Sequence, residues 1–358
     1  MPGSYGLLNE NFREPLIGGA ELQLTMIAKK LAQDFDISFI VYDHGQISPE
    51  KINGIEIFKS FSIEDFPKRK YFKIIYSTFK SLKKANADIY ITRSGRVFPS
   101  IVAFYCYLTR KKFIYSFASD MDLDLDDFGN IELILFKFLL YSADLITTSD
   151  KFQNKQLKEV FGKDSIIINN AYVLKSKIPE KNGILTVLWV STLRKDWKNP
   201  ELYLELAKKF PDIKFIMIGG PDPEDPEFYA EINNKTSEIP NLDFIGFVPF
   251  KEVDNYYSEA SIIVNTSNVE GFPHTFLQAW ERQTPVLSLN IDPDGIICNY
   301  NLGIHSKTFE KMIKDLKRLI DDKNLRYEMG ENGRRYVEQR HDLNVIIDTY
   351  KKTLQNLI

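Results

Sequence analysis

Short runs of β-branched and other apolar residues alternate along this chain with longer segments whose apolar residues recur at helical spacing. This alternation constrains the fold more than any other feature, because strands separated by helices form a parallel sheet with helices on both faces. The chain has 358 residues, of which 44% are hydrophobic and 27% charged, enough for about two such domains. The sequence therefore predicts an α/β protein with two facing doubly wound, Rossmann-like parallel-sheet domains and a cleft between them.

The predicted elements of the first half begin with a helix over residues 20–35. Strands are predicted over 37–41, 88–92, 112–116, 145–148 and 165–168, and further helices over 69–84, 98–109, 131–141 and 151–161. In the second half, Pro200 follows Asn199 as the first residue of a helix, an arrangement that helix starts favour. Strands there are predicted over 185–190, 214–218, 242–245, 262–265 and 286–289, and helices over 253–260, 276–281 and the carboxyl-terminal segment.

The domain boundaries follow from a segment without a clear period. Residues 171–183 contain Pro179, Asn182 and Gly183, which predicts a connector. We expect a first domain over 1–175, a second over 184–340, and a final helix over 341–358 that packs back on the first domain. Doubly wound sheets bind ligands at the carboxyl ends of their strands, so the cleft between the domains is the expected site.

The start of the first domain departs from the usual pattern. A doubly wound domain normally begins with a buried strand that leads into its first glycine-rich turn. Residues 1–17 instead form a short, polar segment that contains Gly and Pro. Either the first strand is missing from the chain, or the residues before Gly18 fold irregularly.

Charge and cysteine content exclude several classes of protein. Lys plus Arg number 46 and Asp plus Glu 49, a net charge of −3, whereas a protein that binds nucleic acid through phosphate contacts is normally basic. Cys106 and Cys298 form no C-x-x-C pair and are interpreted as reduced thiols. No apolar stretch approaches the roughly 18 residues of a membrane span, and the first residues do not resemble a signal peptide. We therefore expect a cytoplasmic protein that binds no nucleic acid.

Two loops carry features of an anion-binding site. Gly18-Gly19-Ala20-Glu21 precedes an amphipathic helix, where backbone N–H groups and the helix N-terminus favour negative charge. Residues 191–200 place Arg194, Lys195 and Lys198 between a strand and its helix, where a pyrophosphate could dock. A simple turn and a solvated basic loop are the respective alternatives.

The segment from Val269 to Trp280 is the most specific in the chain. Glu270 lies in the loop after a predicted strand, and Gly271 and Phe272 offer backbone N–H groups. Gln278 follows two turns later on the predicted helix. A carboxylate accepts hydrogen bonds from paired sugar hydroxyls, so this arrangement favours a polyhydroxylated ligand.

These motifs occur in the order found in family 4 of the retaining glycosyltransferases (glycosyl transferases group 1). The chain resembles that family over nearly its whole length, most closely from residue 185 to about 342. The resemblance implies the GT-B fold, with a nucleotide-sugar donor bound by the second domain. It further implies that Arg194 or Lys195, with Lys198, binds the pyrophosphate and that Glu270 holds the donor-sugar hydroxyls.

The remaining site residues are also taken from the resemblance. Gly271 and Phe272 would line the sugar pocket. His274 is nominated from its place inside the Glu270 motif and would face the donor, with a structural role as the alternative. Phe247 and Val248 would border the base, and Gly18 and Gly19 would approach the diphosphate from the first domain. No metal and no further cofactor are expected, because the fixed cations would neutralise the departing phosphate.

The chain departs from the family pattern at three positions. Gln278 replaces a Glu that binds ribose. Phe117-Ala118-Ser119-Asp120 stands where many relatives carry a His, and Asp120 is nominated as the second catalytic residue, in contact with donor or acceptor hydroxyls. Thr192 replaces an Arg, so the choice between Arg194 and Lys195 stays open.

An acidic run and a basic helix each allow two interpretations. The run comprises Asp120, Asp122, Asp124, Asp126 and Asp127, and it is interpreted as a solvated loop or acceptor-site wall rather than a metal site, since it fails the EF-hand pattern.

In residues 68–84 the favoured interpretation is an apolar stripe that faces the core beneath a solvated basic face. The alternative is peripheral contact with anionic lipid. The stripe comprises Phe72, Ile75, Tyr76, Phe79 and Leu82, and the basic residues are Lys68, Arg69, Lys70, Lys73, Lys80, Lys83 and Lys84.

The resemblance implies a transferase that moves a sugar from a nucleotide donor to a glycan or a lipid-linked acceptor in cell-surface polysaccharide assembly. Two other functions are considered on the same fold. One is a catalytically silent nucleotide-sugar-binding or scaffold protein, suggested by the missing first strand, Ser119 and Gln278. The other is a nucleotide-sugar epimerase.

Overall fold

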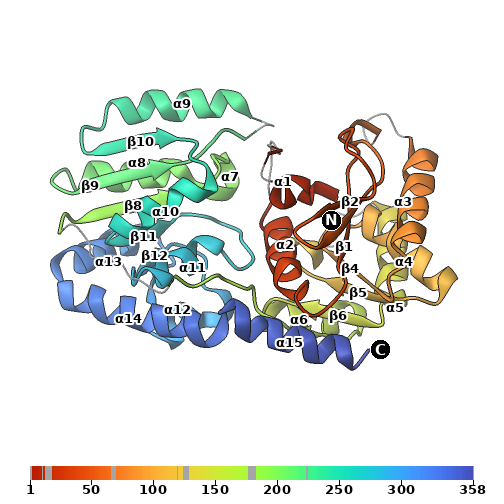
Figure 1. The fold of residues 1–358 in the computed structure, drawn as a ribbon. Helices are drawn as coiled ribbons and strands as arrows, with labels where there is room; N and C mark the ends of the chain where they lie inside the picture. Colours follow the sequence, from red (N-terminus) through yellow and green to blue (C-terminus); the bar gives the residue numbers. More distant parts are fainter. Residues whose placement is uncertain are drawn as a thin grey trace. The chain divides into compact units, whose positions relative to one another are not determined.

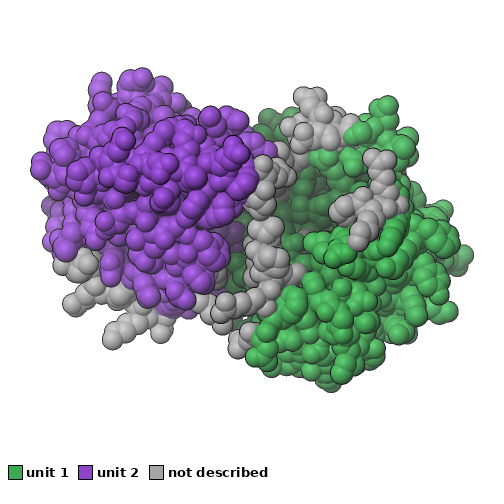
Figure 2. Space-filling model, turned by 90° about the horizontal axis from the view of Figure 1, so that it is seen from above, with its two compact units in different colours: residues 1–171, 343–358 green, residues 172–342 purple. Residues whose placement is uncertain are grey.

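The computed structural model describes residues 2–9, 11–12, 18–65, 70–118, 120–123, 129–175, 183–222 and 225–357, and at residues 120, 121, 250 and 251 it describes the backbone alone. The chain divides into two compact units (Figure 1): residues 1–171 with 343–358 form unit 1, and residues 172–342 form unit 2. Figure 2 shows the two units in separate colours. Residues 172–175, assigned above to the first domain, lie in unit 2, where the Lys175 N–H donates to Glu281 Oε1 at 2.9 Å.

Unit 1 contains a parallel sheet of four strands. Its order is β4 (Ile89–Arg93), β5 (Lys112–Ser116), β6 (Leu145–Thr148) and β7 (Ile166–Ile167). Side chains alternate between the two faces of a strand. In β5, Phe113 and Tyr115 pack with the residues of one apolar cluster and Ile114 packs with those of another.

The two clusters identify the helices on each face of this sheet. The cluster of Phe113 and Tyr115 includes residues of α3 (Tyr71–Ala85), α4 (Val97–Thr109), α5 (Asn130–Ser142) and α6 (Lys151–Phe161). The cluster of Ile114 includes residues of α2 (Gly19–Leu31) and α15 (Leu343–Gln355). The final helix of the chain is therefore part of unit 1.

A second sheet in unit 1 has the strand order β1-β3-β2. β1 (Ser38–Val41) pairs parallel with β3 (Ile55–Lys59), which pairs antiparallel with β2 (Glu50–Ile52). The hairpin between β2 and β3 was not predicted. Its turn is Asn53-Gly54, with φ of 51° and 84°, and an Asn-Gly pair is a strong hairpin signal because both residues accept positive φ.

No strand precedes α2 among the described residues. A 3₁₀ turn (Pro2–Ser4) and α1 (Tyr5–Leu8) occupy that part of the chain. β1 and β4 are edge strands of the two sheets. A cavity of about 150 Å³, lined mainly by apolar residues of α2, α3 and both strands, lies between them. The single sheet expected for the first domain is thus two sheets in the described part of unit 1.

The predicted orientation of the helix after residue 70 is confirmed for Leu82 and Phe79, which pack in the core cluster, and wrong for the first half of the stripe. In α3 the buried residues are Ile74, Thr78, Ser81 and Leu82. Phe72 and Tyr76, expected to face the core, are 86% and 62% exposed. Helical spacing identified an apolar stripe, but the helix packs on the sheet through a neighbouring, partly polar stripe.

Unit 2 has one parallel sheet of six strands in the order β10-β9-β8-β11-β12-β13. Its strands are β8 (Thr186–Val190), β9 (Lys214–Ile218), β10 (Leu242–Gly246), β11 (Ile262–Asn265), β12 (Val286–Ser288) and β13 (Gly303–His305). Its helices are α7 (Lys195–Lys198), α8 (Pro200–Lys209), α9 (Pro226–Ser237), α10 (Phe250–Glu259), α11 (His274–Glu281), α12 (Ile296–Asn299), α13 (Phe309–Asp321) and α14 (Lys323–Arg340).

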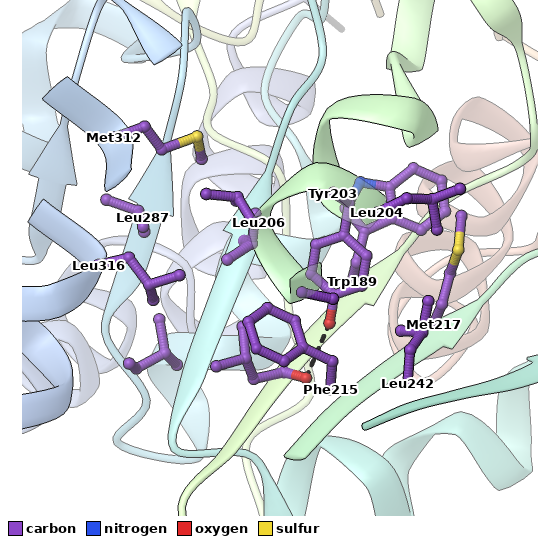
Figure 3. Packing of buried hydrophobic residues seen from close by; sticks show 14 of the residues in the cluster. Trp189, Tyr203, Leu204, Leu206, Phe215, Met217, Leu242, Leu287, Met312 and Leu316 are labelled. Atoms are coloured by element: carbon purple, nitrogen blue, oxygen red, sulfur yellow. Dashed lines mark hydrogen bonds between the residues drawn. The ribbon is translucent and has the colours of Figure 1, made fainter. Parts of the chain in front are cut away.

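Side chains of this sheet alternate between two apolar clusters, so helices cover both faces. Val187 and Trp189 of β8 pack with residues of α8, α9 and α13, whereas Leu188 packs with residues of α10, α11 and α14. Figure 3 shows the first cluster, in which Trp189, Tyr203 and Phe215 lie together. The buried Tyr203 hydroxyl donates to the carbonyl oxygens of Val187 and Ile216. None of the helices in the described ranges is long and apolar enough to cross a membrane.

Candidate functional site

The strand order of unit 2 indicates where a ligand would bind. β8 lies at the centre, and the chain continues through β9 and β10 on one side before it returns to β11, β12 and β13 on the other. At such a switch point the loops after two adjacent strands diverge, and open parallel sheets bind ligands there. The loops after β8 and β11 comprise residues 191–194 and 266–273.

The loop after β8 is held close to the end of β9. The N–H groups of Ser191 and Leu193 donate to the carbonyl oxygens of Ile218 and Gly220. A Cβ added at Gly219 would lie 2.2 Å from Ser191 O, so only glycine fits at this approach. The loop leads directly into the single turn of α7, which ends in Lys198.

Hydrogen bonds join α7 to the loop after β11. The Thr266 hydroxyl accepts from the Trp189 indole at 2.9 Å and donates to Lys198 O at 2.7 Å. The Asn268 N–H donates to Trp197 O at 2.8 Å. These bonds fix the position of Lys198 relative to Glu270, which follows two residues after Asn268.

Lys198 and Glu270, predicted from separate motifs, form an ion pair. Nζ of Lys198 lies 2.9 Å from Oε1 of Glu270, and each side chain is 17% exposed. The same Oε1 accepts from Asn265 Nδ2 at 3.1 Å and from Ser267 Oγ at 2.6 Å. No described residue donates to Oε2. The site therefore presents a fixed cation beside a carboxylate with one oxygen available to a ligand.

The two other predicted cations are directed elsewhere. Arg194 Nε lies 2.8 Å from Asp222 Oδ2, and its guanidinium lies 5.4 Å from the centre of the Trp197 ring. Lys195 Nζ lies 5.7 Å from the centre of the Phe228 ring on α9. Lys198 is the one of these three residues that the structure brings to Glu270.

Gly271 and Phe272, which follow Glu270, present backbone N–H groups rather than side chains to the site. The Phe272 side chain is buried, with its ring 4.8 Å from that of His341. No described residue accepts a hydrogen bond from the backbone N–H of Gly271 or Phe272. His274 is the first residue of α11 and is partly buried, and Gln278 is buried on the same helix.

The residues predicted to border a base lie at the end of β10. Phe247 is 72% exposed, and a Cβ added at Gly220 would lie 3.1 Å from its ring. Val248 packs against the apolar cluster of α10 and α11. Phe247 thus lies against Gly220, two residues after the end of β9, and leaves most of its side chain exposed.

Gly18 and Gly19 lie at the start of α2 in unit 1. Gly18 is the N-cap residue, and a Cβ added there would lie 2.5 Å from Glu21 Oε2. The Glu21 carboxylate therefore folds back over the helix N-terminus. The side chain of Asp120, as well as Ser119 and residues 124–128 of the acidic run, lie outside the described residues.

Unit 1 also contains a pocket of about 690 Å³ at the carboxyl ends of β1 and β4. Ala20 and Glu21 of the predicted glycine-rich turn line it, whereas its other residues come from segments in which the sequence shows no motif. Its polar lining includes Glu21, Tyr42, His44, Ser94 and Arg96. This is the edge of the sheet where doubly wound domains bind ligands.

A cluster of potential metal ligands was also missed. Asp292, Cys298 and His305 place one ligand atom each within 4.8 Å of one another. Burial, together with a hydrogen bond to Asp292, raises the pKa of the Cys298 thiol. His305 Nδ1 lies 3.7 Å from Asp292 Oδ2, so the three side chains form one polar cluster.

Comparison with known proteins identifies the second half of the chain. Residues 173–336 match the family described as glycosyl transferases group 1. "Glycosyltransferase 1 domain-containing protein 1" of Xenopus tropicalis is 26% identical over 52% of this chain and 55% of its own length. "Capsular polysaccharide biosynthesis glycosyltransferase CapM" of Staphylococcus aureus is 24% identical over 56% of each chain. The match thus spans about half the length of these curated relatives.

Solved structures extend the likeness to the whole chain. Anabaena HepE in complex with UDP-glucose superimposes with a TM-score of 0.78 at 15% identity, covering 96% of this chain and 98% of that chain. Likeness at this identity concerns the fold, and it confirms the predicted GT-B class with two Rossmann-like domains.

Proposed function

Because residues 173–336 match the family glycosyl transferases group 1, we propose that the protein is a retaining glycosyltransferase of family 4. It transfers a sugar from a nucleotide donor to a glycan or lipid-linked acceptor. The observation that carries the proposal is the Lys198–Glu270 pair at the switch point of unit 2. A cation for a diphosphate and a carboxylate for sugar hydroxyls lie together there, as a nucleotide sugar requires.

In this proposal each residue has a distinct role. Lys198 Nζ binds the diphosphate and offsets the charge that develops as the sugar departs. Glu270 Oε2 accepts hydrogen bonds from donor-sugar hydroxyls, and the N–H groups of Gly271 and Phe272 line the same site. Phe247 offers its exposed ring to the base. Arg194 requires release from Asp222 before it can contact the diphosphate.

The transfer proceeds without a metal ion. The bond between the anomeric carbon and the diphosphate oxygen breaks, and its electron pair stays on the diphosphate. The acceptor oxygen bonds to the anomeric carbon on the same face, and its proton passes to the departing diphosphate oxygen. The configuration at the anomeric carbon is therefore retained.

The unit 1 pocket is the proposed acceptor site. Its volume of about 690 Å³ falls within the roughly 300–1,000 Å³ of pockets that hold small molecules. Arg96, His44 and Tyr42 supply donors and acceptors for hydroxyl or anionic groups. The CapM relative supports a role in cell-surface polysaccharide assembly, and HepE with UDP-glucose supports a uridine nucleotide as the first donor to test.

The test is nucleotide release from a panel of UDP-, GDP- and ADP-sugars, with glycan and lipid-linked acceptors and with or without EDTA. We expect release from one donor that depends on an acceptor and is unchanged by EDTA. Loss of release with EDTA would overturn the metal-free mechanism. Binding without release would assign the protein to the silent class, and isomerised donor without an acceptor would make it an epimerase.

A further inference from the structure

The outer surface of α3, α4 and α5 in unit 1 is rich in exposed apolar residues. Eleven large hydrophobic residues are exposed there, four on α3, three on α4 and four on α5. They are Tyr71, Phe72, Ile75, Tyr76, Phe104, Tyr107, Leu108, Ile131, Ile134, Leu135 and Tyr141. We call this set the apolar helix face.

α4 packs against both α3 and α5, so the three helices lie side by side (Figure 1). The ring of Phe104 on α4 lies 6.1 Å from Phe79 on α3 and 6.1 Å from Phe138 on α5. Tyr107 lies 5.8 Å from the same Phe138. Aromatic contacts thus connect the helices at the surface as well as in the core.

The exposed area is large for a surface that faces water. Five aromatic residues of the face are between 51% and 86% exposed, and at roughly 150–250 Å² for each full side chain they leave about 500–850 Å² accessible. The largest apolar patch on a typical monomer measures roughly 300–600 Å². An exposed apolar area of this size on three neighbouring helices favours a binding surface.

The charges on these helices are almost all basic. α3 carries Lys73, Lys80, Lys83 and Lys84 and no acid, α4 carries no charged residue, and α5 carries one Lys and one Glu. Lys73 is paired with Asp65, whereas no described acid pairs with the three other lysines of α3. Lys163 lies 3.9 Å over the ring of Tyr141 at the edge of the face.

We propose that the apolar helix face binds the surface of a membrane that contains anionic lipid. Lysine is depleted in protein–protein interfaces, whereas lysine with tyrosine and aliphatic residues is typical of segments that lie at the lipid–water boundary. Phe72, Tyr76 and the exposed residues of α4 insert at that boundary, and Lys80 and Lys83 contact lipid phosphates. The binding does not require transferase activity, so the two proposals fail independently.

Sedimentation with vesicles tests this proposal. We expect the protein to bind vesicles of phosphatidylcholine mixed with phosphatidylglycerol and to bind pure phosphatidylcholine at least about tenfold more weakly, with the anionic binding reduced by high salt. Lys80→Glu with Lys83→Glu should weaken binding about tenfold or more. The charge-matched control is Lys209→Glu with Lys314→Glu, two exposed lysines of unit 2, which should leave binding unchanged.

A second variant tests the apolar contribution. Phe72→Ser with Tyr76→Ser changes two exposed side chains, so it should fold with an unchanged melting temperature and lose vesicle binding, whereas Tyr327→Ser in unit 2 should retain it. Equal binding to neutral vesicles, or full binding by both α3 variants, would overturn the proposal. The parent chain could instead form a dimer and bind no vesicles. If that dimer dissociated in the Phe72→Ser, Tyr76→Ser variant, the apolar helix face would be assigned to a second copy of the chain.

Discussion

Replacing Glu270 with glutamine tests the proposed donor site directly. The substitution keeps the length of the side chain and removes its charge. Hydrogen bonds to a charged group contribute about 1.5–3 kcal/mol and neutral ones about 0.5–1.5 kcal/mol. A sugar hydroxyl that donates to Oε2 should therefore lose about 1–2 kcal/mol, which corresponds to a rise of about 5- to 30-fold in the Kd for a nucleotide sugar.

The same substitution should affect the free nucleotide differently. The ammonium of Lys198 lies 2.9 Å from Glu270 Oε1, and removal of the carboxylate charge leaves that cation free to bind a diphosphate. The Kd for the nucleoside diphosphate should therefore stay the same or fall. Lys198→Met should instead raise the Kd values for both ligands, because it removes the contact to the diphosphate that they share.

Calorimetric titration with UDP and with UDP-glucose measures the Kd of the free nucleotide and the Kd of the nucleotide sugar. If the donor panel identifies another base, the corresponding diphosphate and nucleotide sugar are titrated instead. Glu227→Gln, at an exposed carboxylate of α9, is the matched control. The melting temperature of each unliganded variant shows that it is folded. If Glu270→Gln weakened the binding of UDP and of UDP-glucose equally, the assignment of Glu270 to the sugar would be refuted. Unchanged binding of both ligands would refute it as well.

Three further predictions concern other parts of the chain. Arg96→Gln should raise KM for the acceptor severalfold and leave the donor Kd unchanged; a changed donor Kd would contradict the acceptor pocket. Burial raises the pKa of Asp254, but hydrogen bonds from Arg282 and Lys175 outweigh it and hold that pKa below its usual value. This stabilisation is therefore present above about pH 3.9 and is lost as the pH falls through the lowered pKa. Urea unfolding measures the free energy of unfolding of the parent chain and of Asp254→Asn, and the difference between the two should shrink at acid pH. A difference that stays constant with pH would be inconsistent with the ion pair. Ala28→Leu should partly fill the cavity between β1 and β4 and raise the free energy of unfolding by about 0.5–1.5 kcal/mol; a lower melting temperature would indicate that the cavity walls cannot adjust.

Local sequence patterns predicted the central strands well. β5, β6, β9 and β11 have the bounds expected from their apolar runs. A strand buried on both faces is apolar along most of its length, so its position is visible in the sequence. The short strand β13 was missed because its three residues, which include His305, form no such run.

The side of a helix that faces the core was harder to predict than the presence of the helix. The spacing of Phe72, Ile75 and Tyr76 marks one side of a helix, but spacing does not say whether that side meets the sheet or the solvent. The structure buries Ile74 and Thr78 instead. Most residues that line the unit 1 pocket escaped prediction for a related reason, since they come from separate segments, among them 42–44 and 92–99, that converge only in the folded unit.

The pairing of Lys198 with Glu270 depends on strand order, which the alternation of elements does not determine. If β11 had added next to β10, the loops after β8 and β11 would be three strands apart, or roughly 14 Å at the spacing of neighbouring strands. The observed order puts β11 beside β8, so residues 72 positions apart in sequence meet at 2.9 Å. The separate motifs could identify both residues as ligand contacts. Only the reversal of strand order makes them one site, and this is why the Kd pattern of Glu270→Gln and Lys198→Met tests the topology as well as the chemistry.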